Sequence, residues 1–581
     1  MKKLLFIALL VIISCKQNSE NSTVDLTTKF EISKGTETTT YKETIAYFKL
    51  LANNFSEISI QEMGETDSGF PLHLVLYNSD NEFDLESLKK GSKNIILINN
   101  GIHPGEPDGV DASMMLLRDI AQNEDLKKQY KNVVLAVIPM YNIGGSLNRN
   151  SHSRANQNGP EAYGFRGNAR NFDLNRDFIK SDTKNAQSFA QLFHALNPDV
   201  FVDNHVSNGA DYQYGITHLF TQHNKLGNGL GEFLEQKMRP QIEASLLEKE
   251  IIITPYVNVW GKTPDIGFSQ FFDNARYSTG YTTLFNTFGL MIETHMLKPY
   301  KQRVEETYAL LESIIEFTSN NSDKIKELRT NAVEKILSEK EYAISYELDK
   351  TTFSTLQFKG YEGSLIDSKV TTGKRLFYNR SKPFTKPVKY FNTFKSKQTV
   401  KIPKAYILKS GWWKVIENLK NNNIQFTTFK KDTTINVIEQ KIEDYKTMTA
   451  AYEGHYPHFN TTISQSQKEI HFSKGDIYIP TNQNGVRYII ETFEAEAPDS
   501  FFNWNYFDTI LQKKEGYSAY VFEDIAEEIL NNNPSLKEEL QTKIKTDTEF
   551  AKNPRAQLDF IYKNSPYYEK AHLTLPIYKV Y

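Results

Sequence analysis

The segment NIILINNGIHPGE, residues 94–106, is the part of the sequence that is most informative about the fold. Its first part, Asn94 to Asn99, is a short apolar run of the kind found in strands that are buried on both faces. Asn100-Gly101 then predicts a turn. His103 and Glu106 offer a nitrogen and a carboxylate oxygen at a spacing that zinc sites use. The stretch therefore indicates a buried strand with a candidate metal-binding pair just beyond its carboxyl end.

Further apolar runs alternate with helical patterns after this stretch. Strands are predicted at 132–138, 200–202, 251–253 and 290–292, and helices at 111–122, 186–196 and 230–247. Because the strands are apolar on both faces, helices must cover the sheet from both sides. The pattern predicts an α/β domain over residues 41–320.

Polar groups follow two of these strands at their carboxyl ends, where open α/β sheets collect ligands and catalytic residues. His205 follows the strand at 200–202 and is a third potential metal ligand. Glu293 follows the strand at 290–292, where a carboxylate is costly unless it is paired or functional. Residues 166–178, RGNARNFDLNRDF, are rich in arginine, whose guanidinium group binds a carboxylate through two parallel hydrogen bonds. Together these groups predict a site for an anionic substrate beside a metal ion.

This ordered set of residues resembles the carboxypeptidase A/B-like family of zinc metallocarboxypeptidases. That family carries His-x-x-Glu, an arginine ahead of Asp-x-Asn-Arg, a distant histidine and a catalytic glutamate on a late strand. Residues 41–320 follow the same order. The resemblance implies an α/β/α sandwich around a mixed, mostly parallel sheet. It also implies one Zn²⁺ per chain, held by His103, Glu106 and His205.

The resemblance also implies the catalytic roles. Glu293 is expected to act as the base that takes a proton from water and passes it to the leaving amine. Arg166 is expected to stabilise the oxyanion of the tetrahedral intermediate. Asp173 matches the acid that orients the first zinc histidine, His103.

The substrate-binding residues come from the same comparison. Asn175 and Arg176 are expected to bind the terminal carboxylate of the substrate. Tyr277 lies where the family places a mobile substrate-binding tyrosine, and Tyr281 is the alternative. The sequence departs from the family at Pro104-Gly105, where an arginine is usual.

Three further arginines lie near Arg166 in the sequence. Arg149 and Arg154 precede it and Arg170 follows it. Each of the three is an alternative substrate-facing cation.

The N-terminus predicts export. Met1-Lys2-Lys3 is a positively charged start, and the apolar run from Leu4 to Ile13 suits a signal peptide but is too short to span a bilayer. The run ends in a sequence that resembles a lipobox, and Cys15 is the only cysteine of the chain. We expect residues 1–15 to be a lipoprotein signal peptide with Cys15 as the lipidated residue, and 16–40 to be a flexible tether. The protein would then be anchored on the periplasmic or cell-surface face of a bacterial membrane.

The C-terminal part is less informative. Residues 321–344 are predicted to be a helical connector, and 345–581 to form a mixed α+β accessory region of one or two modules. The formal net charge is -3, and acidic residues are interleaved with the lysines. We therefore expect no nucleic-acid partner.

These observations predict a zinc-dependent hydrolase of peptide bonds, a metallocarboxypeptidase that acts outside the cytoplasm. One alternative is a zinc amidohydrolase or deacylase that acts on N-acyl amino acids or cell-wall peptides. The other is a lipoprotein that keeps the fold as a binding module without turnover. The intact set of His103, Glu106, His205 and Glu293 argues against the binding module.

Overall fold

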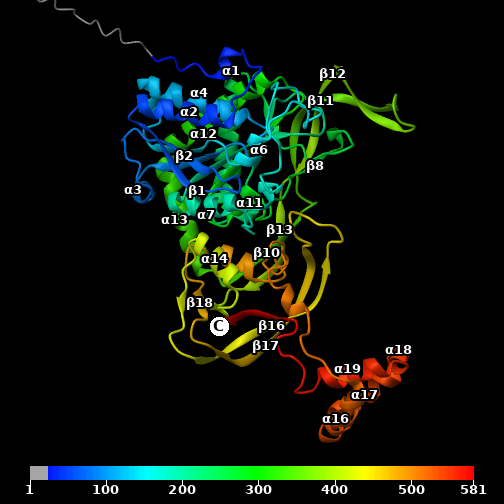
Figure 1. Cartoon of the computed structure of the whole chain (residues 1–581). Helices are drawn as coiled ribbons and strands as arrows, with labels where there is room; N and C mark the ends of the chain where they lie inside the picture. The colour runs from blue at the N-terminus through cyan, green and yellow to red at the C-terminus, as the bar shows by residue number, and fades with distance from the viewer. Residues whose placement is uncertain (1–23) are drawn as a thin grey trace, which may run out of the picture.

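An eight-stranded mixed sheet forms the centre of the N-terminal half in the computed structural model, which describes residues 24–581 (Figure 1). The strand order is β1-β2-β4-β3-β5-β9-β6-β7. The strands are β1 Ile58–Glu65, β2 Pro71–Tyr77, β3 Asn94–Asn99, β4 Val133–Ile138, β5 Val200–Ser207, β6 Ile216–Phe220, β7 Ile253–Pro255 and β9 Phe288–His295. The central strands β4, β3, β5 and β9 run parallel to one another, whereas β2 and β6 run antiparallel to their neighbours β4 and β9.

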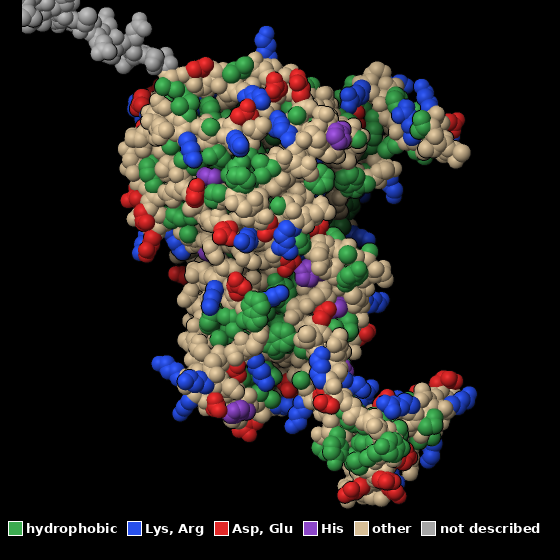
Figure 2. All heavy atoms as spheres, viewed as in Figure 1, with side chains coloured by type: hydrophobic (Ala, Val, Ile, Leu, Met, Phe, Trp, Pro, Cys, Tyr) green, Lys and Arg blue, Asp and Glu red, His purple; other side chains and the backbone are tan. Residues whose placement is uncertain are grey.

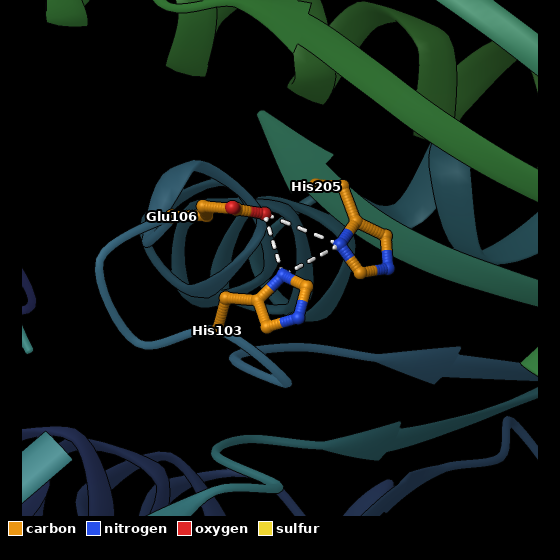
Figure 3. A group of neighbouring side chains, drawn as sticks. All are labelled: His103, Glu106 and His205. Atoms are coloured by element: carbon orange, nitrogen blue, oxygen red, sulfur yellow. Dashed lines mark hydrogen bonds and ion pairs between the residues drawn. The ribbon is translucent and has the colours of Figure 1, made fainter. Parts of the chain in front are cut away.

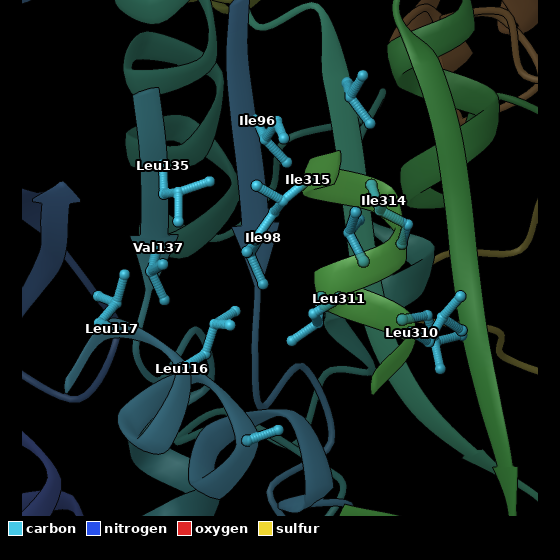
Figure 4. Close-up of a cluster of buried hydrophobic side chains, with 14 of the residues drawn as sticks. Ile96, Ile98, Leu116, Leu117, Leu135, Val137, Leu310, Leu311, Ile314 and Ile315 are labelled. Carbon is cyan, nitrogen blue, oxygen red and sulfur yellow. The ribbon is translucent and has the colours of Figure 1, made fainter. Parts of the chain in front are cut away.

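Helices cover both faces of this sheet, and the predicted α/β/α sandwich is confirmed. One face is covered by α2 Tyr41–Asn54, α4 Asp108–Gln122, α10 Arg239–Glu248 and α12 Tyr300–Asn320. The other face is covered by α7 Lys184–Leu196 and α11 Ser278–Thr283. Because side chains alternate along a strand, Ile96 and Ile98 pack with Leu311 and Ile315 of α12 on the first face (Figure 4). Leu97 packs on the second face. The sheet is therefore apolar on both sides, as the continuous apolar runs require.

The structure also contains strands that the sequence pattern did not predict. They are β1, β2 and β6, which carry polar residues among the apolar ones. The helix predicted at 230–247 is divided into α9 Leu230–Phe233, a π-helical turn Leu234–Met238 and α10. Pro240, at the start of α10, lacks the backbone N–H that a continuous α-helix needs.

The flexible tether predicted at 16–40 is wrong from residue 24 onward. Residues 24–40 include the short helix α1 Lys29–Ile32, whose N-terminus is capped by Thr28. Leu26 and Phe30 are buried in the same core as α12, and the ring of Phe30 packs edge-on against Tyr300. These two apolar residues anchor the polar segment to the domain. Cys15 and the predicted signal peptide lie outside the described residues.

The segment predicted as a helical connector, 321–344, is helical over most of its length and also packs on the N-terminal half. Helix α13 Ser322–Ser338 covers the end of the sheet, and strand β10 already begins at Glu341. Arg329 of α13 donates to the buried Asp199 at 2.6 Å, next to the start of β5. This pairing compensates the buried carboxylate and holds α13 against the sheet.

The C-terminal region is built from antiparallel strands. A pair of strands, β10 Glu341–Leu348 and β13 Phe394–Lys401, leads into it. The long hairpin β11 Ser354–Asp367 and β12 Lys374–Phe391 adds to the short β8 Phe268–Ser269. A six-stranded sheet follows, in the order β15-β18-β14-β19-β16-β17. Its strands are β14 Ala405–Leu408, β15 Thr427–Thr428, β16 Thr433–Thr447, β17 His458–Phe472, β18 Ile477–Pro480 and β19 Thr574–Val580.

Helices α14 Trp413–Asn421 and α15 Val486–Phe493 lie between this sheet and the N-terminal half, and α14 packs on α7. One hydrophobic cluster contains residues from both halves, among them Phe193 and Phe285 from the first and Tyr488 and Trp504 from the second. The two halves form one continuous body in the space-filling view (Figure 2). A group of four helices projects from its far end, α16 Ala519–Asn532, α17 Pro534–Thr546, α18 Thr548–Ala551 and α19 Pro554–Lys563.

Candidate active site

Three potential metal ligands meet at the carboxyl ends of two neighbouring strands. His103 and Glu106 lie in the turn between β3 and α4, and His205 lies on β5 (Figure 3). His103 Nδ1, Glu106 Oε2 and His205 Nδ1 are each 3.2 Å from the other two. All three residues are 3% exposed. Gly101 opens the turn with a φ of 66°, a conformation that favours glycine.

The second nitrogen of each histidine faces a carboxylate. His103 Nε2 lies 3.0 Å from Asp173 Oδ1, and His205 Nε2 lies 2.9 Å from Asp203 Oδ2. Because a carboxylate accepts hydrogen bonds, each Nε2 carries the proton and each Nδ1 keeps its lone pair. Three electron-rich atoms therefore converge on one point. Their lone pairs repel one another unless a cation lies between them. Tetrahedral zinc ligands lie about 3.3 Å apart, so the donor set fits zinc.

Glu293 lies directly beside this triad. In the parallel pair β5/β9, His205 is in register with Glu293, so both side chains point to the same side of the sheet. Burial raises the pKa of the Glu293 carboxyl to about 8. The residue lines a cavity of ≈ 560 Å³ that also contains the triad. The strand register thus places a carboxyl group that can exchange protons next to the metal ligands.

Two arginines of the motif at 166–178 line the same cavity. Arg166 donates from Nε and Nη2 to Asp173 Oδ2 at 3.0 and 2.8 Å, and its Nη1 lies 3.8 Å from Glu106 Oε1. Arg176 lies with its guanidinium carbon 4.5 Å from the centre of the Tyr277 ring. Asn175 is buried, and its Oδ1 accepts a hydrogen bond from the backbone N–H of Ser278. The structure therefore brings Arg166, Asn175, Arg176 and Tyr277 together around the cavity.

The alternative tyrosine is not at the site. Tyr281 is 0% exposed, lies in the core shared by the two halves, and donates to Asn422 Oδ1 at 2.6 Å. A tyrosine that the sequence analysis did not single out, Tyr256, does line the cavity. It follows β7, which runs antiparallel to β5 and β9, so the rule that located His205 and Glu293 at strand ends does not locate it.

Arg154 is the alternative arginine that reaches the site. Its Nη1 lies 2.8 Å from Glu106 Oε1, the oxygen that faces away from the two histidines. The Arg154 side chain passes so close to Gly105 that a Cβ atom at residue 105 would lie 2.5 Å from Arg154 Cδ. The absence of a side chain at residue 105 thus makes room for Arg154. Arg149 and Arg170 instead donate to backbone carbonyls outside the cavity.

The C-terminal region also reaches the motif at 166–178. Glu453, in the turn between β16 and β17, accepts a hydrogen bond from the backbone N–H of Asp173 at 2.8 Å. In the same turn, His455 lies 2.6 Å from Asp182, which also pairs with the buried Lys180. The turn of the accessory region thus fixes the backbone of the residue that orients His103.

Residues 44–205 match the family model for zinc carboxypeptidase, and this range includes the whole triad. This part of the chain is similar to zinc carboxypeptidases. The protein is a zinc-dependent hydrolase whose zinc ligands are His103, Glu106 and His205. The described residues 24–581 contain no helix that is both long and apolar enough to cross a membrane.

Similarity to individual carboxypeptidases extends beyond the family match. Carboxypeptidase 2 of Trichophyton rubrum is 21% identical over 506 residues, which cover 81% of this chain and 84% of that protein. Carboxypeptidase 2 of Trichophyton tonsurans is 20% identical over 504 residues, with the same coverage of 81% and 84%. These alignments are longer than the N-terminal half, so they include part of the C-terminal region. A metallo-carboxypeptidase from Burkholderia cenocepacia has a TM-score of 0.37 at 17% identity and covers 49% of this chain and 69% of its own.

Proposed function

We propose that the protein is an exported, lipid-anchored carboxypeptidase that releases C-terminal residues from peptides, with Glu293 as its catalytic base. One observation carries the proposal: the register of β5 and β9 places Glu293 beside His205 in a cavity that also contains Arg166 and Arg176. Such a site combines a proton acceptor, an oxyanion stabiliser and a carboxylate clamp around one metal position.

A zinc ion held by His103, Glu106 and His205 would supply Lewis-acid chemistry to the substrate carbonyl and to water. Glu293 takes the proton of the attacking water and transfers it to the leaving amine. A nearby divalent cation lowers the pKa of a carboxyl group and thus favours the ionised form that accepts this proton. Asp173 and Asp203 hold the two histidine rings with Nδ1 facing the metal position.

Arg166 is placed to stabilise the negative charge that develops on the scissile carbonyl oxygen. Its Nη1 faces the triad, while its other nitrogens are held by Asp173. Removal of a donor of this kind costs about 10²–10³ in rate. Asp173 therefore serves two groups, the His103 ring and the Arg166 guanidinium.

The substrate carboxylate is proposed to bind at Arg176 and Asn175, beside Tyr277. The cavity adjoins a second cavity of ≈ 720 Å³, with which it shares the lining residues Arg154 and Ala155. This space accommodates residues upstream of the scissile bond. It favours a peptide substrate over a single N-acyl amino acid, the substrate of the alternative deacylase.

The proposed location rests on the sequence of residues 1–15. Cys15 would carry the lipid and hold the enzyme at a bacterial membrane on its periplasmic or cell-surface face. Labelling of cells with a palmitate analogue tests this directly. We expect label on the wild-type chain and none on a Cys15→Ala variant; equal label on both would contradict the lipid anchor.

The activity is tested with one peptide in two forms, a free acid and a C-terminal amide. Zinc-loaded protein is incubated with each form, and the products are identified by mass spectrometry. We expect stepwise loss of C-terminal residues from the free acid and at least about tenfold slower loss from the amide, because the amide offers Arg176 no charge. Cleavage within the chain, or equal rates on both forms, would contradict a carboxypeptidase. Hydrolysis of an N-acyl amino acid in preference to both would favour the deacylase.

A further inference from the structure

The floor of the cavity beside Glu293 is apolar. Met291 precedes Glu293 by two residues on β9, so the two side chains lie on the same face of the sheet. Leu219 of β6 is in register with Met291 across the antiparallel pair. Both line the cavity and are only 3% (Leu219) and 5% (Met291) exposed. Two aliphatic side chains therefore form a surface directly next to the proposed base.

Aromatic rings form the wall that joins this floor to the carboxylate clamp. Phe271 and Tyr277 both line the cavity, with ring centres 5.2 Å apart and planes at 90°. Arg176 lies over the Tyr277 ring. A substrate carboxylate bound by Arg176 would lie beside Tyr277, and Phe271, Leu219 and Met291 line the same cavity, where they can contact the side chain of that residue.

Among the lining residues, only Glu106 and Glu293 carry carboxyl groups. Glu106 is a zinc ligand that is paired with Arg154, and Glu293 is the proposed base. A further carboxyl nearby, Asp273, is 3% exposed, accepts a hydrogen bond from Thr279 and does not line the cavity. A lysine or arginine side chain bound on this floor would bury its charge without a partner, which is unfavourable. A carboxylate side chain would meet the same apolar floor.

We propose that this pocket, formed by Leu219, Met291, Phe271 and Tyr277, selects peptides whose C-terminal residue is large and apolar. The inference rests on the proposed carboxypeptidase function and names its substrate class. Phenylalanine, tyrosine, leucine and methionine bury the most apolar surface there and are released fastest. Alanine and glycine fill the pocket poorly, and charged residues are rejected.

The test uses peptides that differ only in the last residue, which is phenylalanine, leucine, alanine, lysine or glutamate. Release of that residue by zinc-loaded full-length protein is followed by mass spectrometry, and kcat/KM is determined for each peptide. We expect phenylalanine and leucine to exceed lysine and glutamate by about 10²-fold, the discrimination that an apolar pocket provides. Alanine should fall between the two groups.

Two variants test whether the pocket causes the preference for an apolar C-terminal residue. Met291→Asp and Phe271→Asp each add a carboxylate to its floor or wall, and both should raise kcat/KM for the lysine peptide relative to the phenylalanine peptide by at least about tenfold. Phe271 is half-buried in a loop and tolerates a polar residue more readily than the strand position Met291. Leu247→Asp adds the same charge on the exposed side of α10 and should leave the profile unchanged.

The outcomes separate this inference from the function on which it rests. Release of phenylalanine and leucine over lysine, with a shift in the pocket variants alone, supports it. Release of all residues at similar rates, or a preference for lysine or glutamate, overturns the inference but leaves the carboxypeptidase in place. Absence of any C-terminal release overturns the proposed function itself, and the inference with it.

Discussion

The two halves of this chain use strands in different ways. In the N-terminal half, every residue of β3 and β4 is buried, because helices cover both faces of the sheet. In the C-terminal region, the long strands β11, β12 and β17 are mostly half-buried or exposed. The buried sheet positions the zinc ligands and the proposed base at strand ends, within a framework that tolerates little movement. The open strands instead supply turns and hairpins that brace the loops around the cavity.

The C-terminal region thus contributes contacts to the loops around the cavity rather than residues that line it. Glu453 of the β16–β17 turn holds the backbone of Asp173. Tyr378 of β12 donates to the carbonyl of Lys262, close to Trp260, which lines the cavity. The accessory region therefore contacts loops of the catalytic half.

Removal of the C-terminal region should have the largest effect. A chain that ends at Ser338 exposes the shared cluster around Phe193, Phe285 and Tyr281, which Tyr488 and other C-terminal residues cover in the full chain. We expect it to be insoluble or to lack a cooperative thermal transition, since an exposed apolar patch of this kind promotes aggregation. Cooperative melting within a few degrees of the full chain would show that the halves fold independently.

The second-largest effect is expected from loss of the ion pair that joins the two halves. Arg276 Nη2 lies 2.7 Å from Asp499 Oδ1, with side-chain exposures of 21% and 2%. Asp499→Ala leaves the arginine without a partner and should lower the free energy of unfolding by about 3–5 kcal/mol, as measured by urea denaturation. Asp367→Ala breaks an exposed pair with Lys374 in the β11–β12 hairpin and should cost less than about 1 kcal/mol. Similar losses in both variants would argue against a structural role for the junction.

Arg154 should affect metal binding without forming part of the zinc ligand set. It holds the outer oxygen of Glu106, and partners of this kind change metal affinity by about 10–100-fold. We expect Arg154→Ala to weaken zinc binding by this factor in a competition titration with a chelating dye. Arg170→Ala, at an exposed arginine outside the cavity, is the control. An unchanged zinc affinity in Arg154→Ala would mean that Glu106 needs no such support.

His295 should make the smallest contribution, visible only in the pH dependence of stability. Burial lowers its pKa from 6.5 to about 4, and its Nδ1 accepts a hydrogen bond from the backbone N–H of Leu297. The folded state therefore keeps this side chain neutral, and its contribution to stability is full above pH 6.5 and lost as the pH falls towards 4. Between pH 7 and pH 5 the loss is about 2 kcal/mol.

His295→Gln retains a donor and an acceptor but does not titrate. Urea denaturation at pH 7 and pH 5 should therefore show a smaller loss of stability for the variant than for the wild type. An equal loss in both proteins would assign the acid sensitivity to other groups.

The sequence predicted the catalytic half well because the metal ligands and the proposed base lie at the ends of apolar strands. His103, Glu106, His205 and Glu293 all lie just past or at the end of an apolar run, so a local pattern locates them. Asp203 was within reach of the same reasoning, since it lies two residues before His205 and therefore on the same face of β5.

Other contacts join residues that are far apart in the sequence, so no local sequence pattern predicts them. Arg154 reaches Glu106 from a long loop, and Glu453 meets Asp173 from 280 residues away. The tether was misjudged because the burial of Leu26 and Phe30 depends on α12, which is distant in the sequence. In the C-terminal region the strands are rich in lysine and threonine and half-exposed, so their alternation is too weak to fix strand order.

The proposed mechanism depends most directly on the position of Glu293 beside the zinc triad. The decisive measurement compares wild type and Glu293→Gln, both with zinc content determined, on a peptide with a free carboxyl terminus. We predict one zinc per chain in both proteins and a loss of C-terminal release by at least about 10³-fold in the variant, because the glutamine cannot accept the proton. Equal release by the two zinc-loaded proteins would contradict the assignment of Glu293 as the base and the mechanism built on it.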